Sequence, residues 1–156
     1  PHNATVSLPF LSSRSISILD VLVDEYYNEI RKWLTLDTAC CKERPEQDEV
    51  VFHLRNFAAE NPDLLLKGYQ ELDPNSTAEL LFANLRPGDK IAIVSRFADN
   101  VQPYVLALES RGLSVRVIRN QTSVQDFCFL QSTQRELVGA KMSTFVAWAA
   151  ILGDAK

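Results

Sequence analysis

Four short apolar segments, separated by stretches with helical signals, constrain the fold of this chain more than any other feature. The predicted strands are EVVFHLR, KIAIVS, LSVRVIR and ELVGA, at 49–55, 90–95, 113–119 and 136–140. The run KIAIVS is almost continuously apolar, which is typical of a parallel strand buried on both faces. The predicted helices, 75–85, 97–112, 123–133 and 143–153, follow the strands in turn. Such alternation requires right-handed crossovers, so we expect an α/β, Rossmann-like parallel sheet with helices on both faces.

Capping residues indicate where these helices begin and end. We expect Asn75 or Ser76 to cap the first helix and Ser123 the third, because short polar side chains accept from free backbone N–H groups. The last helix carries both signals, since Ser143 opens it and Gly153 closes it.

The first 47 residues differ from the remainder in pattern. TVSLPFL (5–11) is expected to be extended, an amphipathic helix is expected from Asp20, and the polar segment 35–47 is expected to be a loop. We therefore divide the chain into an N-terminal segment, 1–47, and a Rossmann-like domain, 48–156. No initiator methionine is present, so we expect a piece of a longer protein whose preceding domain is not included.

Charge and hydropathy exclude some classes of partner. Sixteen basic and twenty acidic residues give a net charge of −4, which argues against a general nucleic-acid surface. The chain contains no apolar run near the roughly 20 residues that span a bilayer, so no membrane contact is expected for it. Any phosphate contact should be local, made by one or two basic side chains and backbone amides.

Cysteines and glycosylation sequons bear on the compartment. Cys40, Cys41 and Cys128 form no CxxC spacing, so no metal site is expected. One disulfide is allowed, although adjacent cysteines rarely pair, and the favoured interpretation makes Cys128 a small core residue. Sequons begin at Asn3, Asn75 and Asn120. They favour the secretory pathway or Golgi lumen, with the cytoplasm as the alternative.

Polar residues follow the predicted strands at the edge where parallel sheets bind ligands. The candidate residues at these carboxyl ends are His53, Arg55, Asn56, Ser95, Arg96, Ser143, Thr144 and Phe145. Alternation along the predicted strand 49–55 places His53 and Arg55 on one face. There is no GxGxxG and no GxxxxGK[ST], so neither a dinucleotide fingerprint nor a P-loop is supported.

Two of these residues suggest anion chemistry. Arg55 can bind a phosphate or carboxylate through two N–H groups, or it can form a salt bridge with an acid such as Glu60. His53 can donate to the same anion or position Arg55, and otherwise it is a satisfied buried histidine.

The last two predicted helices add further candidates. The hydroxyls of Ser143 and Thr144 and the N–H groups of that first turn can hold an anion, or Ser143 is simply a cap. Asp126 can accept from a nucleobase edge, or it complements a helix N-terminus. A Ser143-His53-Asp126 hydrolase is poorly supported, because no G-x-S-x-G elbow is present.

The pairing of VVFHLR with the later DFCFLQSTQRELVGAKMSTFVAWAAILG resembles the C-terminal half of fucosyltransferase-like glycosyltransferases. These are the alpha-1,2-, alpha-1,6- and protein O-fucosyltransferases of the two-Rossmann, GT-B architecture. Members share a strand ending in His-x-Arg, an acid before an apolar helix, and a Ser-Thr-Phe type of helix start, often followed by Trp. Here His53 and Arg55, Asp126, residues 143–145 and Trp148 match, and the resemblance covers roughly 49–153.

The resemblance implies an inverting, metal-independent transferase that needs no cofactor beyond its donor substrate, a GDP-sugar such as GDP-fucose. It implies that Arg55 and His53 serve catalysis, with Arg55 on the β-phosphate and the helix start at Ser143, Thr144 and Phe145 on the same pyrophosphate. Asp126 would contact the base, and a glycan or protein would be the acceptor.

Members often have a second arginine after His-x-Arg, and Asn56 stands there instead. Because no complete acceptor-binding half is visible, two alternatives stay open. Either that half precedes Pro1, or the chain is a non-catalytic α/β nucleotide- or carbohydrate-binding module.

Overall fold

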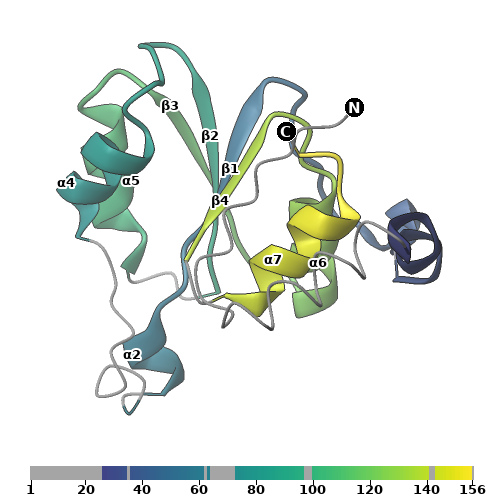
Figure 1. Cartoon of the computed structure of the whole chain (residues 1–156). Helices are drawn as coiled ribbons and strands as arrows, with labels where there is room; N and C mark the ends of the chain where they lie inside the picture. The colour runs from purple at the N-terminus through teal and green to yellow at the C-terminus, as the bar shows by residue number, and fades with distance from the viewer. Residues whose placement is uncertain are drawn as a thin grey trace, which may run out of the picture.

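Four parallel strands form the centre of the domain (Figure 1). The computed structural model describes residues 26–34, 36–61, 63, 73–96, 100–140 and 143–155, so the predicted segment 5–11 and the helix start at Asp20 lie outside the described residues. The strands are β1 (Glu49–His53), β2 (Lys90–Val94), β3 (Ser114–Ile118) and β4 (Glu136–Gly139), in the order β3-β2-β1-β4. The predicted α/β, Rossmann-like sheet is confirmed.

The first strand ends earlier than predicted. β1 stops at His53, so the expected extent to Arg55 is wrong by two residues. Leu54 still donates its N–H to the Val94 carbonyl at 2.9 Å, but the ladder does not continue to Arg55. Alternation therefore does not assign Arg55 to the face on which His53 lies.

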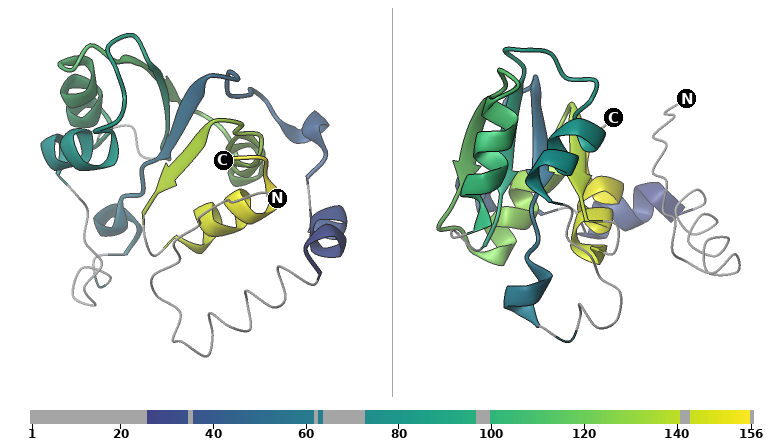
Figure 2. Two further views of the ribbon diagram at one scale, coloured as in Figure 1. Left: turned by 45° about the horizontal axis from the view of Figure 1, so that its top comes forward. Right: turned by 90° about the vertical axis from the view of Figure 1, so that its left-hand side faces the viewer.

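Alternation along the strands divides the core into two layers. On one face Val50 and Phe52 of β1 pack with Leu108 of α5 (Gln102–Glu109) and Ala78 of η2 (Thr77–Leu81), which follows α4 (Pro74–Ser76). On the opposite face Val51 packs with residues of α6 (Ser123–Gln131) and α7 (Thr144–Leu152). Figures 1 and 2 show these helix pairs on opposite sides of the sheet.

Two of the predicted caps are one or more residues late. The first turn of α4 is capped by Asp73, which accepts from the N–H groups of Asn75 and Ser76, and the helical stretch ends at Leu81 rather than 85. Thr122, not Ser123, caps α6. Its side-chain oxygen accepts from the N–H of Gln125, and the Gln125 side chain accepts from the N–H of Thr122, which is a capping box. In each case the capping residue has the extended backbone that a cap requires.

The predicted ends of the last helix are confirmed. Ser143 caps α7, and its hydroxyl oxygen accepts from the N–H of Val146. Gly153 is the residue at which the helix ends.

A disulfide attaches the N-terminal part of the chain to the sheet domain. Residues 26–34 are helical, η1 (Thr38–Cys40) follows, and Cys41 is bonded to Cys128 of α6 with 5.3 Å between their Cα atoms. Cys128 is buried, as expected. It also forms a disulfide, so the prediction that it is only a small core residue is wrong. Cys40 is free and exposed.

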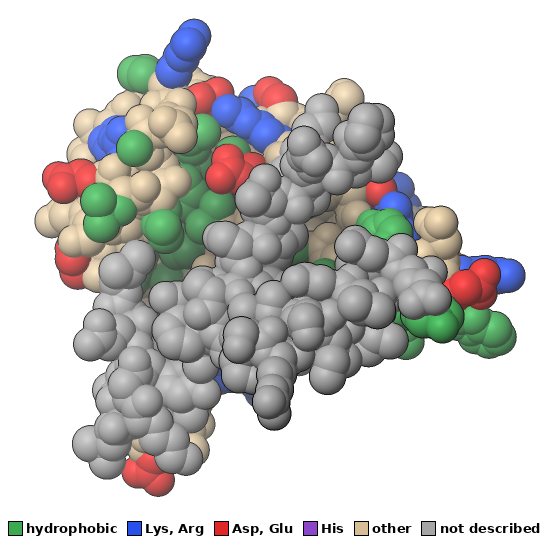
Figure 3. Space-filling model, viewed as in Figure 1, with side chains coloured by type: hydrophobic (Ala, Val, Ile, Leu, Met, Phe, Trp, Pro, Cys, Tyr) green, Lys and Arg blue, Asp and Glu red, His purple; other side chains and the backbone are tan. Residues whose placement is uncertain are grey.

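No described helix is long and apolar enough to span a bilayer. On the face shown in Figure 3, the described basic and acidic side chains are interspersed rather than gathered by sign.

Candidate functional site

The strand order reverses between β1 and β4, and this position is where open parallel sheets bind ligands. β1 has β2 and then β3 on one side and β4 on the other. His53 at the end of β1 is in register with Gly139 at the end of β4. The segment after β1 and the start of α7 after β4 therefore flank the same edge of the sheet.

His53 lies at this edge, partly enclosed by aromatic and charged neighbours. Its ring centroid is 5.6 Å from that of Phe145 in α7. Its Nδ1 atom is buried and has no hydrogen-bond partner among the described residues. Burial, and then the positive charge of Arg55, lower the pKa of His53 from 6.5 to about 4, whereas the charge of Glu60 acts in the opposite direction. The imidazole is therefore neutral at pH 7 and has an unused polar atom.

Arg55 is held by a nearby acid. Its Nε and Nη2 groups donate to the same oxygen of Glu60, Oε2, at 2.8 and 2.6 Å. Both side chains are partly exposed. This pair is the salt bridge that the sequence offered as the alternative to anion binding, while binding of an anion by Arg55 stays a prediction.

Asn56 has a structural contact. It is 5% exposed, and its Oδ1 accepts from the N–H of Ala59 at 2.9 Å, which caps the short helix α2 (Phe57–Glu60). Asn56 is the residue at the position where the resembling family often has a second arginine, and here its side chain serves as a helix cap.

A small cavity lies beside Arg55. Its volume is about 200 Å³ and its lining residues are Leu54, Arg55, Asn56, Pro74, Asn100, Pro103 and Tyr104. Arg55 is the charged residue in this lining, and Asn100 and Tyr104 were not predicted as site residues. Tyr104 follows a proline in the first turn of α5, a signal that predicted the helix but not which side chain enters the cavity.

The N-terminus of α7 combines a buried cap with an exposed hydroxyl. Ser143 is buried, and its Oγ accepts from Val146 N at 3.4 Å. Thr144 is exposed, and Phe145 is half-buried between His53 and Phe127, whose ring centroid lies 5.2 Å away. The free N–H groups of this first turn give it a partial positive charge.

A wider apolar hollow adjoins these rings. Its volume is about 440 Å³ and it is lined by Leu34, Phe127, Thr144, Phe145, Trp148 and Leu152. Trp148 is 39% exposed, so an aromatic face is accessible there. Leu34 and Phe127 were not predicted as site residues.

The other candidates lie at the end of the neighbouring strand β2. Ser95 is buried and Arg96 is exposed. Burial raises the pKa of Asp126, in the first turn of α6, and the charge of Arg96 opposes this increase. The structure thus brings His53 and Phe145 into contact between β1 and α7, and Arg96 near Asp126. Arg55 lies instead beside the cavity that Pro103 and Tyr104 also line.

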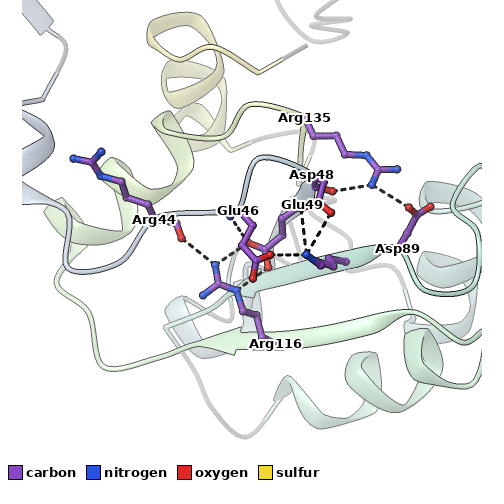
Figure 4. Close-up of polar contacts among 8 residues, drawn as sticks. Arg44, Glu46, Asp48, Glu49, Asp89, Arg116 and Arg135 are labelled. Carbon is purple, nitrogen blue, oxygen red and sulfur yellow. Dashed lines mark hydrogen bonds and ion pairs between the residues drawn. The ribbon is translucent and has the colours of Figure 1, made fainter.

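The largest charge network lies at the opposite, amino edge of the sheet (Figure 4). Arg116 of β3 donates through Nε and Nη2 to the two carboxylate oxygens of Glu49, each at 2.7 Å. Lys90 pairs with Glu46 at 2.6 Å, and Arg135 with Asp89 at 3.1 Å. The Lys90–Glu46 pair connects the segment before β1 to β2, the Arg116–Glu49 pair joins β3 to β1, and the Arg135–Asp89 pair joins the residues that precede β4 and β2. Within the described ranges, no group of three or more His, Cys, Asp or Glu side chains is arranged to hold a metal ion.

Comparison of the chain with family models, with curated proteins and with solved structures finds no match.

Proposed function

We propose that this domain binds a nucleotide sugar, and that it is the donor-binding domain of an inverting, metal-independent glycosyltransferase of the fucosyltransferase type. The observation that supports this proposal is the position of His53, two residues before Arg55, next to the start of α7. Both lie where the strand order reverses, and the ring contact between His53 and Phe145 joins them. The proposed donor is GDP-fucose or a related GDP-sugar, and the acceptor is a glycan or a protein.

In this proposal the diphosphate meets three kinds of donor. Arg55 supplies a full positive charge, His53 supplies a neutral imidazole whose Nδ1 atom has no partner among the described residues, and the first turn of α7 supplies N–H groups. As the bond to the sugar breaks, negative charge accumulates on the diphosphate. Donors already in position lower that barrier, and the loss of one typically reduces the rate by about 10²–10³.

The base of the nucleotide has a proposed position near α6. The Asp126 carboxylate can accept from N–H groups of a guanine edge; burial raises its pKa, and the charge of Arg96 acts against that increase. The adjoining hollow offers the aromatic faces of Phe127 and Trp148 for a flat ring.

A specific observation favours a second candidate, a binding module that performs no transfer. The side chain of Asn56 caps α2 and Arg55 is paired with Glu60, so fewer cationic groups face the ligand than in the resembling transferases. Such a module would bind a nucleotide or carbohydrate at the same edge without catalysis.

The Cys41–Cys128 disulfide supports a secretory location for either candidate. Disulfides persist in oxidising compartments, and donor-dependent glycosylation takes place in the same lumen.

A thermal-shift panel of GDP, UDP, ADP and GDP-fucose tests the proposal. A ligand at 100 times its Kd stabilises the folded state by about 2.7 kcal/mol, so we expect GDP and GDP-fucose to raise the melting temperature and UDP and ADP to do so less. Arg55→Ala should remove the shift. The matched control is Arg86→Ala, because Arg86 is exposed in the turn before β2, at the opposite edge. An unchanged melting temperature with all four nucleotides would refute the proposal.

Transfer assays on a longer chain separate the two candidates. If the chain is a transferase, Arg55→Lys should lower turnover of GDP-fucose by about 10²–10³, because a point charge replaces the bidentate fork. Nucleotide binding with no transfer to any acceptor tested would favour the binding module.

A further inference from the structure

Glu60 accepts hydrogen bonds from the guanidinium group of Arg55, the same group that the proposed function assigns to binding the diphosphate. Two donors of Arg55, Nε and Nη2, are directed to one carboxylate oxygen. The side chains are 26% and 31% exposed, so water screens the pair only in part. An anion that approaches Arg55 therefore meets a negative charge less than 3 Å from the guanidinium nitrogens.

Local structure places Glu60 there. Asn56 begins α2 through its side-chain cap, and its carbonyl accepts from the N–H of Glu60 at 3.1 Å. One helical turn thus brings the carboxylate back over Arg55, five residues earlier in the chain. Both partners therefore come from one short segment of the chain.

We infer that Glu60 is an internal competitor for the diphosphate, and that it favours the donor over the nucleoside diphosphate product. This inference rests on the proposed function. Glu60 repels any anion at Arg55 in proportion to the charge of that anion. When the sugar leaves, the terminal phosphate gains an ionisable oxygen, so the product carries more negative charge than the donor. Glu60 therefore weakens product binding more than donor binding and promotes release.

The surroundings of the pair fit this role. The adjoining cavity of about 200 Å³ contributes the amide groups of Asn56 and Asn100 and the Tyr104 ring, none of them ionised at pH 7. His53, two residues before Arg55, is neutral at that pH. Glu60 is a carboxylate in direct contact with Arg55, and Glu60→Gln removes one negative charge from this contact.

Calorimetric titration of GDP and of GDP-fucose into wild type and Glu60→Gln tests the inference. We expect Glu60→Gln to bind GDP about tenfold more tightly, which equals about 1.4 kcal/mol, and GDP-fucose about threefold more tightly. Glu136→Gln is the matched control, because it removes the same charge from an exposed position where β4 begins. That variant should bind both ligands as wild type does.

The outcomes separate this inference from the function on which it rests. A gain for GDP that exceeds the gain for GDP-fucose supports it. Equal or weaker GDP binding by Glu60→Gln, with wild type binding normally, overturns it and makes Glu60 a positioning residue for Arg55. Binding of neither ligand by wild type overturns the proposed function as well. Glu60→Ala should also bind GDP more tightly than wild type. This second variant shows that the gain comes from loss of the carboxylate and not from a new contact of the glutamine amide.

Discussion

Acid pH should destabilise this domain through His53. The folded-state pKa of His53 is about 4 against an ordinary 6.5, so below pH 6.5 the unfolded chain binds a proton that the folded chain does not accept. The contribution is therefore fully present above pH 6.5 and is lost as pH falls towards 4. A difference of about 2.5 pKa units corresponds to about 3 kcal/mol, of which about 2 kcal/mol should be lost between pH 7 and pH 5.

Urea unfolding of wild type and His53→Gln at pH 7, 6, 5 and 4 measures this loss. The difference in unfolding free energy between the two proteins isolates His53, because other titrating groups are common to both. The chain has only two histidines, and His2 is retained in the variant. We expect wild type to lose about 2 kcal/mol more than His53→Gln between pH 7 and pH 5. A difference that stays constant over this range would refute the reasoning, because it would mean that His53 is protonated as readily in the folded state as in the unfolded state.

Three further predictions concern stability and modification. Glu49→Ala should cost about 3 kcal/mol in urea unfolding, because it removes a 1% exposed carboxylate that accepts two hydrogen bonds from Arg116. Glu43→Ala, which removes the exposed and more distant partner of Arg116, should change little, and equal effects would contradict this. Cys41→Ser should cost about 4 kcal/mol without reductant, because the disulfide joins residues 87 apart, while Cys40→Ser should leave the unfolding midpoint unchanged. Asn120 is exposed, so chain secreted from eukaryotic cells should carry a glycan there, detected by mass spectrometry as conversion to aspartate after enzymatic release, and an unmodified Asn120 in disulfide-bonded chain would argue against a secretory origin.

The strands and the last helix could be predicted from the sequence because local pattern determines them. The run KIAIVS is β2 with four of its five residues fully buried, as a central parallel strand requires. Ser143 and Gly153 bound α7, and both are residue types preferred at the ends of helices. At α6, by contrast, Thr122 and Ser123 are both capable caps, and only the extended backbone of Thr122 distinguishes them.

Contacts between distant segments could not be predicted in this way. The bidentate pair of Glu49 and Arg116 depends on β3 lying beyond β2, and sequence spacing contains no information on that order. The choice of Cys41 rather than Cys40 as the partner of Cys128 depends on which thiol faces α6. The salt bridge of Arg55 and Glu60 could be anticipated because the two residues are five apart.

The strand order has a consequence for the protein while it is being synthesised. Of the strands that the structure describes, β4 is the last to emerge, yet it pairs with β1, the first of them. Until it arrives, one side of β1 presents unpaired N–H and C=O groups beside the apolar run of Val50, Val51 and Phe52, which is a template for aggregation. A nascent chain that stalls before Glu136 would therefore lack β4 and α7, which form half of the proposed binding edge, and would depend on chaperones. We expect premature termination in this region to give insoluble product.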